Sequence, residues 1–147
     1  MELTVKKFSE LTVFELFEIY KLRSAVFVVE QKCIYQDIDD ADKMAYHVFL
    51  KDGDGIQAYL RVLSAEHSGH GHVMIGRVIA AKRGCGLGRR IVAEGIIVAR
   101  EKFGGEKIIV AAQTYAKGFY ERSGFVRSSD EFVEDGIPHV MMTLDNK

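Results

Sequence analysis

The chain has 147 residues, of which 48% are hydrophobic and 28% charged, and its formal net charge is −1. This length predicts one domain, residues 1–147, with enough apolar content to bury its own core. The small net charge argues against a nucleic-acid partner, which would require a basic excess. No apolar stretch approaches the roughly 20 residues of a membrane span, and the N-terminus lacks a signal-peptide core. We therefore expect a cytoplasmic protein without a membrane partner.

Two cysteines, Cys33 and Cys85, are the whole complement of this residue type. Their spacing matches no zinc-binding pattern, and Cys85 stands between two glycines. We expect no disulfide between them, which fits a reducing compartment.

The first half of the chain predicts a strand, a helix and a hairpin. Residues 3–8 have strand character. Thr12 and Glu15 have the spacing of a capping box, which opens a helix over residues 12–25, whereas the apolar residues 26–35 are ambiguous. An acidic loop follows, with aspartates at 37, 39, 40 and 42. Strands over residues 46–50 and 57–65 flank Asp52-Gly53-Asp54-Gly55, which predicts a hairpin.

The second half predicts further strands alternating with helices. Residues 73–81 form a strand, residues 87–103 form an amphipathic helix closed by Gly104-Gly105, and residues 107–113 form a buried strand. Residues 114–123 read as a short helix, and two last strands cover residues 125–133 and 139–144. This order predicts an α/β (α+β) domain with a mixed, strongly twisted sheet flanked by helices.

The most informative segment joins the strand over residues 73–81 to the helix that follows it. Its sequence is Lys82-Arg83-Gly84-Cys85-Gly86-Leu87-Gly88. Glycines allow a ligand to approach the backbone closely, and a helix N-terminus offers unpaired N–H groups and a positive dipole end. The segment is therefore typical of a phosphate-binding turn.

Three kinds of phosphate site compete for this turn. A P-loop requires GxxxxGK[ST], which the sequence does not contain. A dinucleotide fingerprint requires a third glycine where Arg89 stands, and an acidic residue near the end of the next strand, where Gln113 stands. A third kind of phosphate site fits the turn better.

Residues 83–88 match [QR]-x-x-G-x-[GA], the signature of the GCN5-related N-acetyltransferases (GNAT). Residues 116–125 (AKGFYERSGF) resemble the second signature of that family, and longer strings resemble its ElaA-like branch: residues 26–31, the aspartates up to Asp42, His47, and residues 134–139. The resemblance covers the whole chain. It implies the GNAT-type acyl-CoA N-acyltransferase fold, with six to seven strands and about four helices.

The resemblance implies that acetyl-CoA is the cosubstrate. Backbone N–H groups of the turn would hold its pyrophosphate, and the residues concerned are Arg83, Gly84, Cys85, Gly86, Leu87, Gly88 and Arg89. Backbone groups of Val78, Ile79 and Ala80 would pair with the pantetheine arm, as if it were an added strand. Gln113 would donate a hydrogen bond to the cofactor. The alternative for the turn is a tight connection between strand and helix with solvated arginines. The alternative for residues 78–80 is that they are ordinary core residues of a strand.

Tyr120 is the residue that the family places as general acid, because a phenol can protonate the coenzyme A thiolate as it leaves. The alternative is a packed aromatic side chain. A general base for the amine comes from four candidates, of which Glu30 and His139 lead and His47 and Asp135 follow. Each could instead have a structural role, and a chain of water molecules could replace a single base.

The remaining polar clusters predict no metal site. His67, His70 and His72 lack acidic or cysteine partners, so a polar loop is expected. The aspartates at 37–42 lack the glycine and glutamate of a calcium loop, and we expect them to cap turns or to attract a cationic acceptor.

The resemblance therefore implies that the chain is an N-acetyltransferase. It would transfer acetyl directly to a primary amine of a small molecule or peptide. The alternative is a coenzyme A-binding module or acyl sensor without transfer activity. An exposed sheet edge would allow a homodimer.

Overall fold

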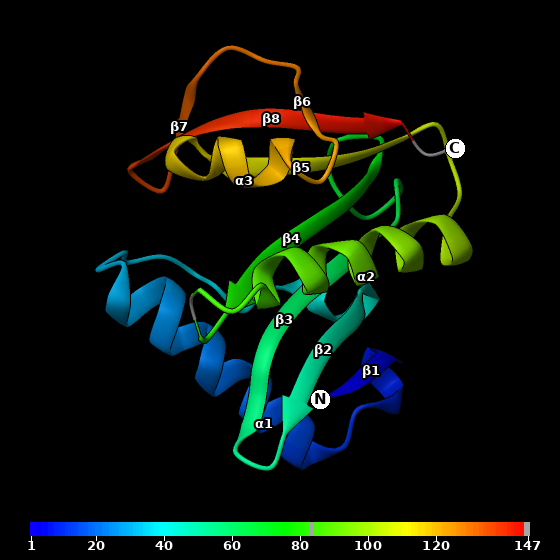
Figure 1. The fold of residues 1–147 in the computed structure, drawn as a ribbon, viewed down its shortest axis with the longest axis vertical. Helices are drawn as coiled ribbons and strands as arrows, with labels where there is room; N and C mark the ends of the chain where they lie inside the picture. The colour runs from blue at the N-terminus through cyan, green and yellow to red at the C-terminus, as the bar shows by residue number, and fades with distance from the viewer. Residues whose placement is uncertain (83, 146–147) are drawn as a thin grey trace.

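A computed structural model describes residues 1–82 and 84–145, and Figure 1 shows its arrangement. The strands are β1 (Glu2–Lys7), β2 (Tyr46–Asp52), β3 (Gly55–Leu63), β4 (Val73–Ala80), β5 (Lys107–Gln113), β6 (Val126–Arg127), β7 (Phe132–Glu134) and β8 (Ile137–Asp145). The α-helices are α1 (Val13–Arg23), α2 (Leu87–Lys102) and α3 (Lys117–Glu121). Short 3-10 turns cover Phe8–Glu10, Asp40–Met44 and Thr114–Ala116, and Ser24–Glu30 is a π-helical segment.

The strands form one mixed sheet in the order β1-β2-β3-β4-β5-β8-β6, with β7 also paired to β8. Every pair is antiparallel except β4 and β5. The predicted mixed sheet is confirmed. The described residues form eight strands rather than six or seven, because the segment predicted as one strand over residues 125–133 divides into β6 and β7. They form three α-helices rather than about four, since the apolar run after α1 continues as the π-helical segment.

Local sequence signals account for where the elements of the N-terminal half begin and end. Thr12 accepts a hydrogen bond from the backbone N–H of Glu15, and the Glu15 side chain accepts one from the N–H of Thr12, which is the predicted capping box. Asp52 pairs with Gly55, so the hairpin between β2 and β3 turns through two residues as predicted. In the described part of the chain, no helix has the length and apolar character needed to cross a membrane.

Helices α1 and α2 cover opposite faces of the sheet. Alternate residues of a strand point to opposite faces, so Leu60 belongs to the core under α2 while Tyr59 belongs to the core under α1. Helix α2 lies close to β3 at Gly95, where an added Cβ would lie 2.7 Å from Leu60 Cδ2. This small residue allows α2 to lie close over the centre of the sheet.

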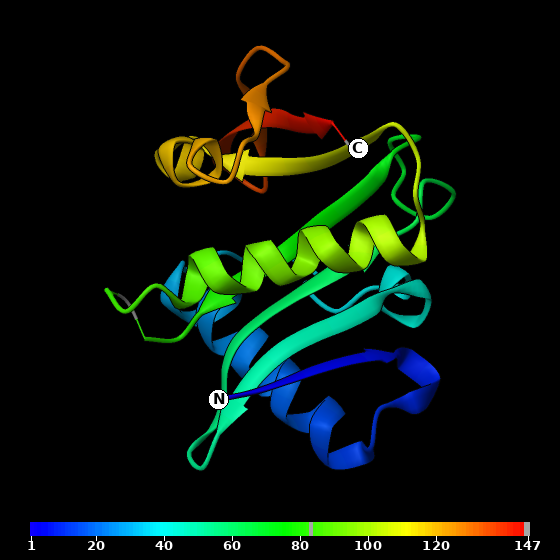
Figure 2. The same cartoon turned by 45° about the vertical axis from the view of Figure 1, so that its right-hand side comes forward.

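The sheet opens between β4 and β5, and this opening positions the functional site. The two parallel strands pair at Val73–Ile108 and Met74–Ile109. Beyond these pairs β4 continues to Ala80 and β5 to Gln113 without further pairing between them. Figures 1 and 2 show the strands close at one end and diverging toward the other. The result is a wedge whose walls are β4 and β5.

Candidate functional site

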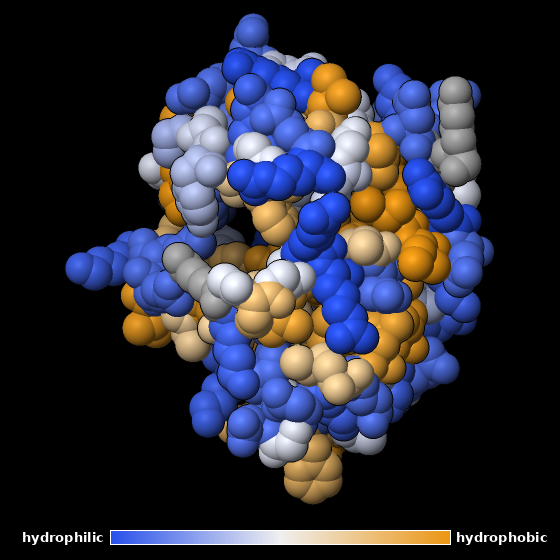
Figure 3. All heavy atoms as spheres, in the orientation of Figure 1, coloured by the Kyte–Doolittle hydropathy of each residue, from blue (hydrophilic) through white to orange (hydrophobic). Residues whose placement is uncertain are grey.

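A cavity of about 1210 Å³ occupies the wedge between β4 and β5. A dark hollow is visible in Figure 3 between the start of α2 and the layer formed by α3 and β5. The predicted site residues that line the cavity are Glu30, Val78, Ile79, Ala80, Gly88, Gln113, Tyr120, Asp135 and His139. Residues from several segments that are distant in sequence therefore meet at one cavity.

Strand β4 carries a bulge where it leaves β5. Tyr59 pairs with Ile79 and Arg61 with Gly76, so Arg77 and Val78 lie opposite the single residue Leu60. Arg77 has φ 54°, a left-handed backbone conformation that residues other than glycine rarely adopt. A bulge interrupts the ladder and leaves backbone groups unpaired. Both bulge residues line the cavity, so such groups are available beside it.

The glycine turn leads directly into α2. Gly84 and Gly86 have φ of 78° and 76°, and Gly86 is the N-cap of α2 without a side-chain cap bond. The first N–H groups of the helix are therefore open to a ligand. Gly84, Cys85, Gly86 and Arg89 are exposed. Arg83, which was predicted to bind the cofactor, lies outside the described residues.

Two residues of the predicted turn have roles in packing. Leu87 is buried in the core under α2, so its contribution to a phosphate site is its backbone. Gly88 lies beside Phe119, because an added Cβ at position 88 would be 3.1 Å from Phe119 Cε1. The two family signatures, the turn and the Phe119-Tyr120 segment, therefore touch at the cavity.

Tyr120 lies at the cavity with its ring packed between two aromatic side chains. Its ring makes edge contacts with Phe119 and Phe125, at centroid distances of 5.1 and 5.9 Å, and the residue is 9% exposed. No hydrogen bond to this hydroxyl occurs among residues 1–82 and 84–145. Burial, with a smaller contribution from Tyr115, raises the pKa of the Tyr120 phenol. The phenol is thus a protonated donor near neutral pH.

His139 also lines the cavity, from β8, and it has a defined tautomer. Its Nδ1 lies 2.6 Å from the carbonyl oxygen of Ile137, and since a carbonyl can only accept, Nδ1 carries the hydrogen. The lone pair is then on Nε2, which lies 4.0 Å from Glu134 Oε2. His139 is paired with Gln113 across β8 and β5 and stacks on Phe132 at 5.8 Å. This geometry suits a proton acceptor.

The other three base candidates differ in position. Glu30 lines the cavity from the end of the π-helical segment. Asp135 lies in the turn between β7 and β8, and its backbone oxygen accepts a hydrogen bond from Cys33 Sγ at 3.3 Å. His47 is outside the cavity lining and fully buried. It contacts the Tyr59 hydroxyl at 2.7 Å and the backbone oxygen of Asp42 at 2.9 Å, so the hypothesis that His47 is a base is wrong.

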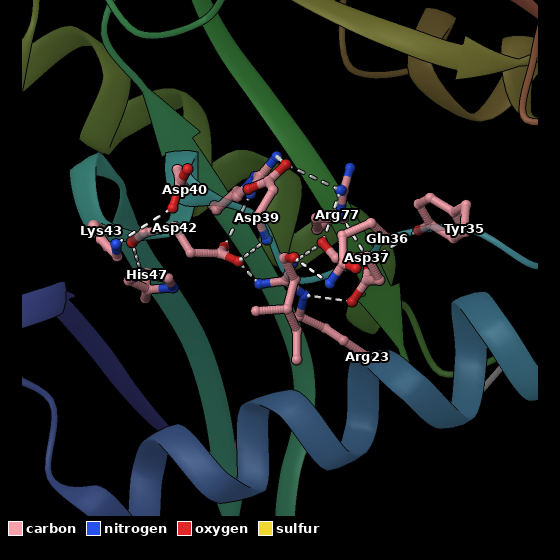
Figure 4. Close-up of polar contacts among 12 residues, drawn as sticks. Arg23, Tyr35, Gln36, Asp37, Asp39, Asp40, Asp42, Lys43, His47 and Arg77 are labelled. Atoms are coloured by element: carbon pink, nitrogen blue, oxygen red, sulfur yellow. Dashed lines mark hydrogen bonds and ion pairs between the residues drawn. The ribbon is translucent and has the colours of Figure 1, made fainter.

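Three aspartates of the acidic loop, Asp37, Asp39 and Asp42, form ion pairs with arginines rather than presenting free negative charge, whereas the exposed Asp40 pairs with Lys43. Figure 4 shows this cluster between α1 and the sheet. We call it the Arg–Asp cluster, and it consists of Arg23, Asp37, Asp39, Asp42, Arg61 and Arg77. Three guanidinium groups balance three carboxylates, so the expectation that these aspartates attract a cationic acceptor is wrong. The expectation of turn capping is confirmed for Asp39 and Asp42, which form a capping box.

The ionised arginines and aspartates of the Arg–Asp cluster stabilise one another's charged forms. Burial opposes ionisation of Asp42, but hydrogen bonds and charge from Arg23 and Arg61 outweigh it and lower the pKa of this carboxyl. The bond from Arg23 Nη1 to Asp42 Oδ1 is 2.7 Å, and that from Arg61 Nη1 is 2.9 Å. The sequence contained no local signal for this cluster, because its arginines come from α1, β3 and β4.

The histidine loop contributes His67 and His70 to one end of the cavity. In the described part of the chain, no group of three or more His, Cys, Asp or Glu side chains could hold a metal ion. Cys33 and Cys85 are both free thiols, one buried and one exposed.

The wedge, the bulge and the glycine turn define an acyl-CoA N-acyltransferase fold, and the protonated phenol of Tyr120 lies at its cavity. A solved acyl-CoA N-acyltransferase from Pseudomonas aeruginosa matches with a TM-score of 0.89 and 34% identity, over 97% of this chain and 99% of that one. Escherichia coli ElaA matches with a TM-score of 0.88 and 34% identity, over 97% of both chains.

The family follows from the sequence comparisons. Residues 8–146 match the model of the acetyltransferase (GNAT) domain. A UPF0039 protein of Schizosaccharomyces pombe is 38% identical over 99% of this chain and 97% of its own length, and ElaA of Escherichia coli is 36% identical over 93% and 92%. The chain belongs to the GNAT family and resembles its ElaA members.

Proposed function

We propose that this protein is an N-acetyltransferase that moves the acetyl group of acetyl-CoA directly to a primary amine. The observation that carries the proposal is the wedge between β4 and β5, with the Tyr120 phenol and the His139 imidazole among the groups around one cavity. An acyl transfer needs a proton donor for the leaving group and a proton acceptor for the nucleophile. The cavity offers both.

The cosubstrate would enter at the α2 end of the wedge. Its pyrophosphate would meet the N–H groups from Gly84 to Arg89, since a helix N-terminus favours an anion. Its pantetheine arm would lie along Val78, Ile79 and Ala80, where β4 has lost its β5 partner. Gln113 lines the cavity from β5 and would donate to the cofactor. Gly88 has no side chain, and this would leave room beside Phe119 for the pantetheine arm.

The chemical step would proceed in a ternary complex. The amine nitrogen attacks the thioester carbonyl carbon, and the C–S bond breaks as the new C–N bond forms. Unpaired N–H groups of the β4 bulge would stabilise the negative charge that develops on the carbonyl oxygen. His139 Nε2 would take the proton from the nitrogen, with Glu30 as the second candidate base. Tyr120 would protonate the departing thiolate.

We propose a cationic acceptor, as either a small molecule or a peptide amine. The negative charge that would attract it comes from Glu134 and Asp135 at the cavity wall, since the Arg–Asp cluster is balanced. We further propose that the protein acts in the cytoplasm without a nucleic-acid or membrane partner and without a metal. The edge position of β1 would allow a homodimer.

The experiment is an acceptor screen that follows thiol release from acetyl-CoA across amines, aminoglycosides and peptides. The proposal predicts thiol release that depends on the amine, with a matching amide in the mass spectrum. The alternative function is a coenzyme A-binding module or acyl sensor. Tight acetyl-CoA binding without turnover on any amine would favour that alternative, and binding of NADH in place of acetyl-CoA would contradict both.

A further inference from the structure

We propose that Asp37 is a positioning residue for acyl transfer, because through Arg77 it holds the β4 bulge at the point where the strand leaves β5. This inference rests on the proposed function for its effect on catalysis. Asp37 is distant in sequence from the glycine turn and from the Phe119-Tyr120 segment. Its contacts nevertheless converge on the bulge beside the cavity.

The bulge has a conformation that its own backbone does not favour. Arg77 adopts φ 54°, and such a residue persists only where its surroundings determine it strongly. Arg77 Nε lies 2.8 Å from Asp37 Oδ1, as an ion pair without the alignment of a hydrogen bond. Its Nη2 donates to the backbone oxygen of Asp37 at 2.9 Å. The guanidinium also lies 5.6 Å from the ring centre of Tyr35.

Asp37 is itself fixed from the opposite side. Arg23 Nε donates to Asp37 Oδ2 at 3.1 Å, and Arg23 Nη2 donates to the Asp37 backbone oxygen at 2.8 Å. The Tyr35 hydroxyl donates to Asp37 Oδ1 at 2.8 Å. Asp37 is 4% exposed and Arg23 is fully buried. Asp37 therefore joins the end of α1 to the bulge of β4, as Figure 4 shows.

A purely stabilising role is a poor explanation for this arrangement. Replacing buried ion pairs by well-packed apolar side chains is often neutral or stabilising, so stability alone does not require such a cluster. Directional hydrogen bonds to both the carboxylate and the backbone of one residue do fix geometry. The geometry that they fix belongs to Arg77 and Val78, both of which line the cavity.

The test compares Asp37→Asn with Asp40→Asn. Asp37→Asn keeps the size and the backbone carbonyl of the residue but removes the negative charge with which Arg77 and Arg23 form ion pairs. The second removes a carboxylate from the same loop that is 98% exposed and pairs with Lys43 at 3.3 Å. We expect Asp37→Asn to lower kcat about 10- to 100-fold through misplacement, with KM for acetyl-CoA nearly unchanged. Asp40→Asn should match the wild type.

A second readout does not depend on turnover. Hydrogen exchange of the backbone amides of Gly76 and Ile79, the paired residues on either side of the bulge, should become faster in Asp37→Asn when measured on the free protein, while amides elsewhere in the sheet remain protected. If the wild type acetylates no amine, the proposed function fails, and this exchange measurement still decides whether Asp37 holds the bulge. Unchanged kcat with unchanged exchange would overturn the inference. Faster exchange throughout the sheet, with kcat and the melting temperature falling together, would also overturn it.

Tyr35→Phe provides a milder variant in case Asp37→Asn fails to fold. It removes the hydroxyl that donates to Asp37 Oδ1 and leaves both arginine contacts in place. We expect kcat to fall about 2- to 10-fold, as for the loss of one hydrogen bond, together with faster exchange confined to the bulge. No change in either quantity would count against the inference.

Discussion

Replacing Tyr120 by phenylalanine separates catalysis from folding, because the ring is packed while the hydroxyl has no protein partner in the described part of the chain. The ring contacts with Phe119 and Phe125 remain in the variant. Loss of a general acid typically costs 10² to 10⁴ in rate, which corresponds to about 2.7 to 5.4 kcal/mol of transition-state stabilisation. Removal of a hydroxyl that has no hydrogen-bond partner in the described part of the chain should leave the free energy of unfolding unchanged or raise it by about 1 kcal/mol.

The assay measures three quantities on the wild type and the variant. Thiol release gives kcat, calorimetry gives the Kd of acetyl-CoA, and thermal unfolding gives Tm. We expect kcat to fall by the stated factor, Kd to stay within about twofold, and Tm to stay the same or rise by about 2–4 °C. Tyr115→Phe is the matched control, because Tyr115 also lines the cavity but is 80% exposed. A kcat for Tyr120→Phe equal to that of the control would refute the assignment of Tyr120 as the acid.

Three further predictions concern the turn, the packing of α2 and the ion pairs. Gly86→Val should weaken acetyl-CoA binding in calorimetry, because a branched side chain at φ 76° is strained and blocks approach to the backbone; an unchanged Kd would exclude the turn as the site. Gly95→Ala should destabilise the protein by about 1 kcal/mol in denaturant titration, because crowding of Leu60 exceeds the gain in helix propensity; a stabilised variant would contradict the close packing. The lowered pKa of Asp42 means that its stabilising contribution is present above about pH 4 and lost as pH falls through its folded-state pKa. Asp42→Asn should therefore flatten the loss of stability toward acid in chemical denaturation, and equal slopes would contradict this.

The elements with local signals were predictable from the sequence. Thr12 and Glu15 mark the start of α1, and Asp52 to Gly55 mark the hairpin, because caps and tight turns depend on residues close together in the chain. The end of α1 was less predictable. The apolar residues after it fit several structures, and packing in the folded protein selects the π-helical segment.

The glycine turn and Tyr120 could be singled out as candidates because they lie in contiguous motifs. The Arg–Asp cluster was missed, since its partners are brought together by the sheet and lie 14 to 40 positions apart along the chain. His47 and His139 could not be told apart by sequence. The structure separates them, because one is enclosed by Tyr59 and Asp42 while the other keeps a lone pair at the cavity.

The central claim is direct transfer of acetyl from acetyl-CoA to an amine in the wedge between β4 and β5. The most direct test mixes the wild-type protein carrying acetyl-labelled acetyl-CoA with an excess of an amine identified by the acceptor screen, and follows a single turnover. The account predicts that label enters the amide at the same rate as free thiol appears, with none on the protein. Label that accumulates first on Cys85 or another side chain, or thiol release without amide formation, would contradict it.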